Sequence, residues 1–245
     1  MQAEYQSPES RTAAIEDSYS YAEAVARPVA RRREDHRISE PFRYRVVKRC
    51  LDVFLIMVSA PATLLLLGIV SVMVMLSSPG PIFYSHRRIR KNGAFFSMWK
   101  FRTMCVNSAE VLEEYLSSHP EARAEWNKTH KLRHDPRITP IGSFLRRYSL
   151  DELPQLWNVL SGHMSLVGPR PIVAAEVEKY ADSFECYCRV KPGLTGLWQV
   201  SGRSELTYDE RVALDCEYVN RWSLRRDIKI LLKTFVVVAT QDGAY

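Results

Sequence analysis

One stretch of the sequence reads Arg146-Arg147-Tyr148-Ser149-Leu150-Asp151-Glu152-Leu153-Pro154-Gln155-Leu156-Trp157-Asn158-Val159-Leu160. Its apolar residues recur at the spacing of one helical face, and Ser149 with Glu152 three positions later fits a capping box, which predicts a helix start. Pro154 complicates that register, because proline has no N–H and prefers the first turn of a helix. In either register, Asp151 and Glu152 lie at or just before a positive helix end, which also attracts phosphates.

Arginines surround these two adjacent carboxylates. Acidic residues are common in a first helical turn, so the pair alone indicates little about function. Arg146, Arg147 and Arg170 add guanidinium donors that suit oxyanions. Adjacent carboxylates normally need a cation or a proton in order to share a site. A divalent metal together with a diphosphate would meet both needs.

The composition allows one sizeable core together with a membrane element. The chain has 245 residues, 46% of them apolar, and a formal net charge of +6. Basic residues gather at 43–49 and at 87–91, in patches that suit nucleic acid, anionic lipid or a diphosphate. Five cysteines without a framework predict free thiols in a reducing cytoplasm. The chain has no Gly-x-Gly-x-x-Gly or Walker A pattern, so nucleotide binding by those loops is unsupported.

The first 78 residues divide into a tail and an apolar run. Residues 1–41 are predicted to be disordered, because they carry too few bulky apolar side chains to offset the entropy of ordering. Val53 to Leu76 contains no charged residue and is long enough to span a bilayer, which takes about 20 residues. Basic clusters flank both ends, and a straight span would place one of them outside. Pro61 should kink the segment, so residues 42–78 are predicted to be a re-entrant membrane helix, with a buried soluble helix as the alternative.

The remaining chain is predicted to be mostly helical with one short β-hairpin. The hairpin strands are expected at 82–84 and 93–101, around a basic turn at 86–91. Helices are expected at 107–129, with a stop near Pro120, and at 172–190, 205–222 and 227–239, with a loop over the site at 191–203. The last helix pairs apolar bulk with lysines, which suits either a membrane surface or packing on the core.

Several long motifs in one order resemble the bacterial sugar transferase family, the monotopic phosphoglycosyl transferases that load a sugar phosphate onto undecaprenyl phosphate. The likeness runs from about Lys48 to Tyr245. It rests on Lys-Phe-Arg-Thr-Met at 100–104, the loop at 135–142, Ser-Leu-Asp-Glu-Leu-Pro-Gln-Leu at 149–156, Gly-Pro-Arg-Pro at 168–171 and Lys-Pro-Gly-Leu-Thr-Gly-Leu-Trp-Gln-Val-Ser-Gly-Arg at 191–203.

The resemblance implies an α+β fold with a re-entrant membrane helix hairpin that breaks at a proline. Many relatives carry Ser-Pro at that point, whereas this chain has Ala60-Pro61. Residues 79–245 would form a small, mostly helical cytoplasmic catalytic domain with a short β-hairpin and amphipathic interfacial helices. The implied location is the bacterial inner membrane, with the catalytic domain facing the cytoplasm.

The resemblance also implies an activity: transfer of hexose 1-phosphate from a UDP-hexose to undecaprenyl phosphate, with release of UMP, as the first membrane step of exopolysaccharide synthesis. Galactose or glucose is the expected sugar, because the C-terminal sequence is most similar to enzymes that begin succinoglycan-type polymers. Asp151 would attack phosphorus to form a covalent intermediate, Glu152 would act as the base, and both carboxylates would hold Mg²⁺. The expected substrate-binding residues are Lys100, Arg102, Arg146, Arg170, Gln199 and Arg203.

Two other function classes remain at this point. A non-catalytic membrane module that binds nucleotide sugars or scaffolds other exopolysaccharide glycosyltransferases would be expected to lack the carboxylate pair or its arginines, which are present here. A nucleic-acid-binding protein would carry its charge on one solvent face with stacking aromatics, whereas these basic clusters bracket an apolar segment. We therefore expect no nucleic-acid partner, and we expect UDP-hexose, undecaprenyl phosphate and inner-membrane lipid as partners.

Overall fold

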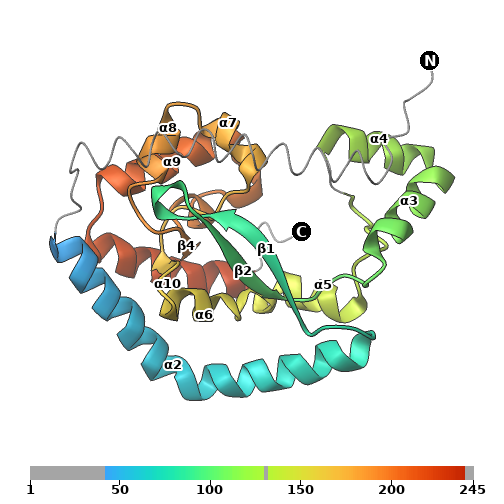
Figure 1. Cartoon of the computed structure of the whole chain (residues 1–245), viewed down its shortest axis with the longest axis horizontal. Helices are drawn as coiled ribbons and strands as arrows, with labels where there is room; N and C mark the ends of the chain where they lie inside the picture. The colour runs from blue at the N-terminus through green and yellow to red at the C-terminus, as the bar shows by residue number, and fades with distance from the viewer. Residues whose placement is uncertain (1–41, 130–131, 241–245) are drawn as a thin grey trace.

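A long helix, α2 (Phe42–Ser77), lies along one side of the molecule (Figure 1). The computed structural model describes residues 42–129 and 132–240, so the tail predicted at residues 1–41 lies outside the described residues. Many of the large apolar side chains of α2 are exposed, among them Phe54, Leu65 and Leu76. Within the described chain, α2 is the one helix that is long and apolar enough to cross a membrane. This agrees with the apolar membrane segment predicted from the sequence.

α2 continues through Pro61 as a single helix. A proline inside a helix removes one backbone hydrogen bond and bends the axis without necessarily ending the helix. The Ser59 hydroxyl adds to this effect, because it donates to the carbonyl oxygen of Leu55 at 2.9 Å, a contact that often bends helices. Figure 1 shows α2 changing direction along its length. A bend is therefore present, but the chain does not reverse tightly into two antiparallel arms.

The β-hairpin predicted after the apolar segment is confirmed. β1 (Phe83–Ile89) and β2 (Phe95–Phe101) pair antiparallel, with Tyr84 opposite Lys100 and Phe83 opposite Phe101. The turn itself is shorter than predicted, because β1 extends through most of the basic run to the buried Ile89. Only a 3-10 turn at Lys91–Gly93 then separates the strands.

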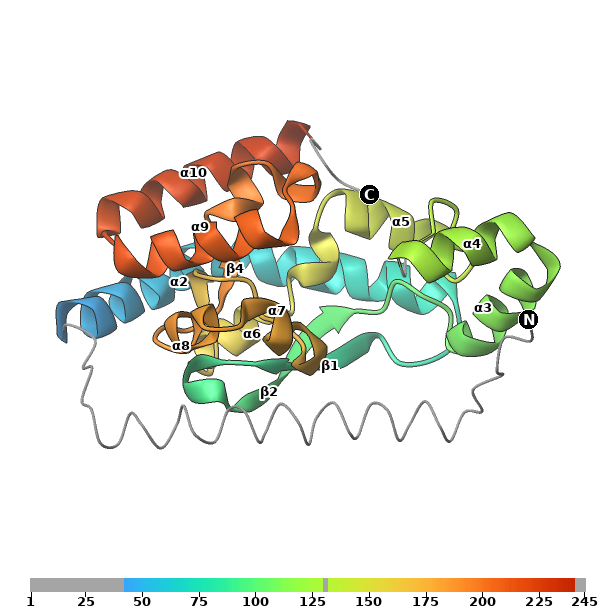
Figure 2. The same ribbon diagram turned by 90° about the horizontal axis from the view of Figure 1, so that it is seen from above.

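The helical regions are mostly confirmed. The confirmed ones are α3 (Ser108–Ser118), α4 (Pro120–Thr129), α6 (Gln155–Leu160), α9 (Tyr208–Asn220) and α10 (Leu224–Thr240). A further helix, α5 (Pro140–Arg147), was not predicted and begins within the loop expected at 135–142. The break between α3 and α4 falls at the predicted stop near Pro120. Figure 2 shows α3 and α4 at the end of the molecule opposite α9 and α10.

The single amphipathic helix predicted at 172–190 is wrong. The chain there forms a 3-10 turn at Ala174–Glu176 and two short helices, α7 (Val177–Tyr180) and α8 (Ser183–Tyr187). Ala181 interrupts them with a positive φ of 41°, which a continuous right-handed helix does not allow. Tyr180, Phe184 and Tyr187 are nevertheless buried together in one cluster. The apolar pattern therefore indicated residues of the hydrophobic core and not a continuous helix.

α10 (Leu224–Thr240) shows both features predicted as alternatives from its sequence, a face packed on the core and an exposed apolar face. Ile230 is buried in the same core cluster as Met98 of β2 and Val159 of α6, so this helix packs on the domain. Its other side exposes Leu232, Phe235 and other large apolar residues. Packing on the core is therefore confirmed for one face, and the second face stays apolar and exposed.

A second, parallel strand pair was not predicted, and one of its two strands lies within the predicted loop at 191–203. β3 (Ser165–Val167) pairs with β4 (Gly193–Thr195), and the register places Ser165 opposite Gly193. 3-10 turns at Trp198–Val200 and Arg203–Glu205 follow β4. The loop predicted at 191–203 is therefore partly ordered as a strand, and it joins two of the quoted motifs in space.

Buried charged side chains fasten the first turns of α2 to this domain. The Nζ of Lys48 lies 2.6 Å from Oδ2 of Asp227 on α10, and both side chains are almost fully buried. Asp52 accepts a hydrogen bond from the Ser165 hydroxyl at 2.8 Å. Arg49 donates to the Leu160 carbonyl oxygen at the end of α6, at 2.6 Å. Lys48 and Arg49, which precede the apolar run of α2, therefore also bind this helix to the rest of the domain.

Candidate functional site

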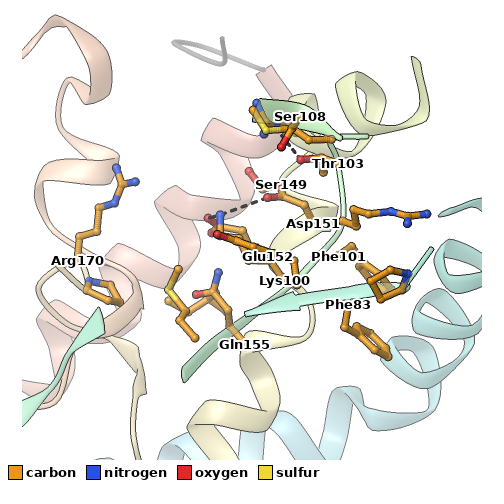
Figure 3. A pocket seen from close by; sticks show the side chains of 18 of the residues that line it. Phe83, Lys100, Phe101, Thr103, Ser108, Ser149, Asp151, Glu152, Gln155 and Arg170 are labelled. Carbon is orange, nitrogen blue, oxygen red and sulfur yellow. Dashed lines mark hydrogen bonds and ion pairs between the residues drawn. The ribbon is translucent and has the colours of Figure 1, made fainter. Parts of the chain in front are cut away.

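A cavity of about 600 Å³ opens where β1, β2 and the segments after them meet the chain around residue 150. Figure 3 shows this pocket, with the carboxylates of Asp151 and Glu152 and the side chain of Lys100 near its centre. Residues from five separate parts of the sequence line it, including five of the six predicted substrate-binding residues: Lys100, Arg102, Arg146, Arg170 and Gln199. The neighbouring Arg147 is exposed and is not among the lining residues.

The backbone around Ser149 directs the two carboxylates into this pocket. The predicted capping box is wrong, because the Ser149 side chain makes no capping hydrogen bond and its backbone is left-handed, with a φ of 55°. α5 ends at Arg147, and a 3-10 turn at Leu150–Glu152 follows before α6 begins at Gln155. Asp151 and Glu152 both lie in this turn between the two helices, and both line the cavity.

Lys100 bridges the two carboxylates. Its Nζ lies 3.2 Å from Oδ2 of Asp151 and 2.7 Å from Oε1 of Glu152. Asp151 is buried, whereas the side chains of Lys100 and Glu152 are 25% and 31% exposed. The pair therefore has one buried member and one member that solvent or a substrate can reach.

The environment separates the pKa values of these neighbours. Burial raises the pKa of the Asp151 carboxyl above its ordinary value, and the charge of Lys100 offsets only part of that rise. Burial acts on Glu152 as well, but Lys100, Arg170 and a hydrogen bond from Gln155 outweigh it and lower the pKa of Glu152. Burial lowers the pKa of Lys100, but the two carboxylates raise it further, so the ammonium stays protonated. Paired carboxyls with separated pKa values are typical of sites that divide acid–base roles.

Arg146 reaches the pocket from the end of α5. This helix begins at Pro140, with the hydroxyl of Thr139 accepting the N–H of Gly142 as an N-cap. The Nε of Arg146 donates to the Thr103 hydroxyl at 2.9 Å. That contact fixes the guanidinium beside Asp151 and leaves its other N–H groups as donors for a ligand oxyanion.

Arg170 reaches the pocket from the opposite side (Figure 3). It follows β3, whose end approaches β4 so closely that a Cβ on Gly193 would lie 2.1 Å from the backbone nitrogen of Gly168. Only glycine fits such a contact, which explains why both motifs contain one. The guanidinium carbon of Arg170 lies 5.8 Å from the centre of the Trp198 ring, and the residue is exposed. Arg170 is therefore a cation that a ligand can reach.

The other predicted residues differ in their accessibility. Gln199 lines the pocket. Arg102 also lines it, but its guanidinium donates to the carbonyl oxygens of Ser78 and Pro79, just after α2. Arg203 is not among the lining residues, and its Nε donates to the Gln199 carbonyl oxygen at 3.2 Å. Arg102 thus anchors the end of the apolar helix, and Arg203 supports Gln199 from behind.

The sequence interpretation did not select four residues that take part in the site. Thr103 holds Arg146, Gln155 bonds Glu152, and Phe83 and Tyr84 line one end of the cavity. Thr103 and Gln155 lie inside quoted motifs, so their position beside charged residues was a usable signal. Phe83 and Tyr84 carried no such signal, because an aromatic pair in a strand is more often part of a core.

The carboxylates fit a divalent cation that is shared with a phosphorylated ligand. The Lys100 ammonium already lies between them, where a positive charge is favourable. The described residues contain no cluster of three or more His, Cys, Asp or Glu that would hold a metal by protein groups alone. Mg²⁺ commonly binds through one or two carboxylates, with substrate phosphates and water completing its shell. The donor set suits that arrangement.

The amino-acid sequence of this chain is similar to those of known proteins over most of its length. The sequence profile of the bacterial sugar transferases matches residues 43–241, which include all the elements described above except the first residue of α2. The chain belongs to the bacterial sugar transferase family. Four of the five motifs quoted from the sequence therefore line one cavity in a member of this family, and the loop at 135–142 does not.

Three relatives are similar over much of the chain. The UDP-galactose-lipid carrier transferase of Erwinia amylovora is 54% identical over 82% of this chain and 42% of its own length. The undecaprenyl-phosphate galactose phosphotransferase of Salmonella typhimurium is 57% identical over 68% of this chain and 35% of its own length. The exopolysaccharide production protein ExoY of Sinorhizobium fredii is 48% identical over 82% of this chain and 88% of its own length. The chain thus spans less than half of the first two proteins and most of the third.

Proposed function

We propose that this bacterial sugar transferase moves hexose 1-phosphate from a UDP-hexose to undecaprenyl phosphate and releases UMP, as the first membrane step of exopolysaccharide synthesis. The observation that carries the proposal is the pair Asp151–Glu152, bridged by Lys100 in an open cavity between Arg146 and Arg170. Two carboxylates supply a nucleophile and a base, and the cations on either side suit a diphosphate. The names of the Erwinia and Salmonella relatives support the same reaction class, and the third relative is named for exopolysaccharide production.

The first step is displacement at phosphorus. An Asp151 carboxylate oxygen attacks the phosphorus that bears the sugar, and the bond from that phosphorus to the bridging oxygen breaks. The electron pair of that bond leaves on UMP, and the hexose phosphate stays on Asp151 as an acyl phosphate. Lys100, Arg146 and Arg170 stabilise the negative charge that accumulates on the phosphate oxygens.

In the second step, Glu152 takes the proton of the acceptor phosphate, whose oxygen then attacks the same phosphorus. The bond to Asp151 breaks, the aspartate carboxylate is restored, and the product is a hexose-diphospho-lipid. Glu152 suits this role because it is partly exposed and lies next to the nucleophile. When bound, Mg²⁺ would be held by Asp151 and Glu152 and would neutralise diphosphate charge.

Galactose is the preferred donor sugar in this proposal, with glucose as the alternative. The relatives that are named for galactose are 54% and 57% identical to the chain. The lipid product would pass to further glycosyltransferases of the exopolysaccharide assembly. Release of UMP from a panel of UDP-sugars with undecaprenyl phosphate tests the donor directly.

The proposed location is the bacterial inner membrane, with the catalytic domain on the cytoplasmic side and α2 entering and leaving one face of the bilayer. Basic residues flank both ends of the apolar run, and α2 bends within it. Single cysteines placed near Tyr44 and near Asn92 should then be labelled from the same side of the membrane. Labelling from opposite sides would show a span instead, and Pro61→Leu should favour that result.

The covalent step is tested with the donor alone. Enzyme mixed with UDP-hexose in saturating Mg²⁺ should release UMP in a burst and retain sugar phosphate on the protein. Asp151→Asn should abolish both, because an amide is too weak a nucleophile to attack phosphorus. Glu152→Gln should keep the burst while turnover falls, because its role begins with the acceptor. UMP release that requires undecaprenyl phosphate would contradict the covalent route and leave Asp151 as a metal ligand.

A further inference from the structure

The pocket has a charged end and an apolar end. Arg170 and Gln199 line the charged end, and Lys100 lies between the carboxylates near the centre. Pro81, Phe83 and Val106 line the other end, and none of these three side chains has a hydrogen-bonding group. The polar side chains near them are Tyr84 and Arg102, and the Arg102 guanidinium already donates to the carbonyl oxygens of Ser78 and Pro79. Figure 3 shows Phe83 and Phe101 beside α2, with Arg170 on the far side of the carboxylates. A ligand that fills the pocket therefore meets two different environments.

The apolar end is continuous with the membrane helix. The Phe83 ring stacks on Phe101 with the ring centres 5.3 Å apart. Phe101 is buried in one cluster with Val70 and Val74, which lie in the second half of α2. Apolar contact therefore runs from the surface of the helix, through the core, to the pocket wall.

Val106 forms the other side of this end. A Cβ on Gly80, just after α2, would lie 2.1 Å from Nη1 of Arg102 and 2.6 Å from Cγ2 of Val106, so both side chains pack closely against Gly80. Phe83 is 44% exposed and Val106 is 65% exposed, so both present apolar surface that nothing in the described chain covers. Exposed apolar surface that rims a polar cavity is typical of a ligand site.

We propose that Phe83 and Val106 form the subsite for the first isoprene units of the lipid acceptor, and that Arg170 and Gln199 form the end that receives the nucleotide. This assignment rests on the proposed function and names the position of each substrate within it. An isoprenyl phosphate entering beside α2 would bring its phosphate toward Asp151 and Glu152 and leave its hydrocarbon against Phe83. The polarity of the pocket thus gives the two substrates opposite directions of approach.

The main competing occupant of this end is the uracil base, which could stack on the exposed Phe83 ring. A base carries amide and carbonyl groups that lose their water partners on burial and need hydrogen bonds in return. Pro81, Phe83 and Val106 offer none from their side chains, and the nearby Arg102 guanidinium is already bonded to the carbonyl oxygens of Ser78 and Pro79. The other end offers Gln199 and Arg170. A hydrocarbon has no such requirement and gains from burial. The chemistry of the apolar end therefore favours the isoprenyl chain.

The kinetic test uses the full chain in detergent with UDP-galactose or UDP-glucose and undecaprenyl phosphate. Phe83→Ala should raise the KM for undecaprenyl phosphate by about tenfold, the size expected for loss of one buried aromatic contact. The KM for the UDP-sugar and the UMP burst without acceptor should not change. Phe83→Leu should restore most of the acceptor affinity, because it remains apolar. An increase confined to the KM for UDP-sugar would overturn the proposal in favour of base stacking.

A matched control and a second variant separate binding from folding. Phe144 on α5 is also 44% exposed but does not line the pocket, so Phe144→Ala should leave the KM for the acceptor unchanged. Phe83 touches the core residue Phe101, so its loss could disturb folding. Val106→Ser avoids that problem, because Val106 is more exposed, and it should also raise the KM for the acceptor. Equal effects of Phe144→Ala and Phe83→Ala would overturn the subsite.

Photolabelling provides a readout that needs no turnover. A farnesyl phosphate that carries a diazirine on its first isoprene unit should label the segment from Pro81 to Val106. Undecaprenyl phosphate should compete with this labelling, and Phe83→Ala should reduce it. Labelling confined to α2 or α10 would overturn the subsite. Labelling as expected in an enzyme that releases no UMP from any UDP-sugar would refute the proposed function and leave the isoprenyl subsite intact.

Discussion

Two lysine–carboxylate clusters in this protein use the same chemistry in opposite ways. At the base of α2, Lys48 bonds Asp227, which also accepts hydrogen bonds from Tyr218 at 2.7 Å and Trp222 at 2.9 Å. Both oxygens of this carboxylate have partners, and Lys48 and Asp227 are almost fully buried. In the pocket, Lys100 bonds two carboxylates, and Lys100 and Glu152 remain partly exposed.

The two clusters differ in whether their charged groups remain accessible to a ligand. The Lys48 cluster is closed, so breaking it would leave a buried charge without compensation. The Lys100 cluster is open and joins more acidic groups than its one cation can neutralise. An incoming metal or phosphate can exchange with the lysine there, because solvent and ligand reach the same atoms. The closed cluster is a structural fastener, and the open one has the properties of a reactive site.

The largest expected effect is on stability, at the closed cluster. Lys48→Met should lower the free energy of unfolding by about 3–5 kcal/mol, because Asp227 would stay buried without its cation. Thermal unfolding in detergent would measure this change. Lys48→Met combined with Asp227→Asn should recover part of the loss, because both charges are then gone. A double variant that is less stable than the single one would contradict this account.

The next effect is on catalysis, at the open cluster. Arg170→Ala and Arg146→Ala should each cost about 2–4 kcal/mol of transition-state stabilisation, as loss of a fixed oxyanion donor does elsewhere. Lysine at either position should rescue only part of this, because the bidentate fork is lost. Arg147→Ala is the matched control, since Arg147 is an exposed neighbour outside the pocket. Comparing kcat/KM for the five variants with wild type checks this. Full activity in Arg170→Ala would remove that residue from the site.

A smaller effect is expected at the turn that opens the reactive cluster. Ser149 has a left-handed backbone, which glycine adopts freely and β-branched residues strongly resist. Ser149→Val should therefore cost about 1–3 kcal/mol of stability, and the UMP burst should fall with it. Ser149→Gly should keep the fold and the burst. Equal stability of the two variants would show that the backbone here adapts to its side chain.

The smallest effect concerns pH. Asp151 attacks only when ionised, and its raised pKa means that the burst rate should fall, as the solution is acidified, at a pH above the ordinary value of 3.8. Lys100 lowers the pKa of both carboxyls, so Lys100→Met should move this acidic limb to higher pH. A shift of about one unit corresponds to a tenfold change on the limb. Burst rates of the two enzymes between pH 4 and 8 would measure it, and an unmoved limb would exclude Lys100 as the controlling charge.

The sequence predicted features that depend on local pattern. The hairpin, the breaker at Pro120, the apolar helix and the convergence of Asp151 with Arg146 and Arg170 followed from periodicity, composition and motifs. The sequence-based prediction was wrong at positions where contacts with distant residues determine the backbone conformation. The helical spacing of apolar residues does not reveal the left-handed backbone of Ser149 or the interruption at Ala181, because the packing around each residue imposes its conformation. Arg102 was expected to face the substrate, and its bonds to the carbonyl oxygens after α2 depend on where that helix ends.

The contacts of α2 at its two ends have a consequence for kinetics. Arg49 and Asp52 tie its first turns to the chain around the pocket, and Arg102 ties the residues that follow its last turn. No loose linker separates the helix from the site, so a bilayer that holds α2 also fixes the height of the pocket above its plane. Such an enzyme meets its lipid acceptor by diffusion within the plane of the bilayer rather than through the bulk solution. Its rate should follow the mole fraction of acceptor in the lipid, and diluting the acceptor with inert lipid should slow turnover even when the bulk concentration is constant.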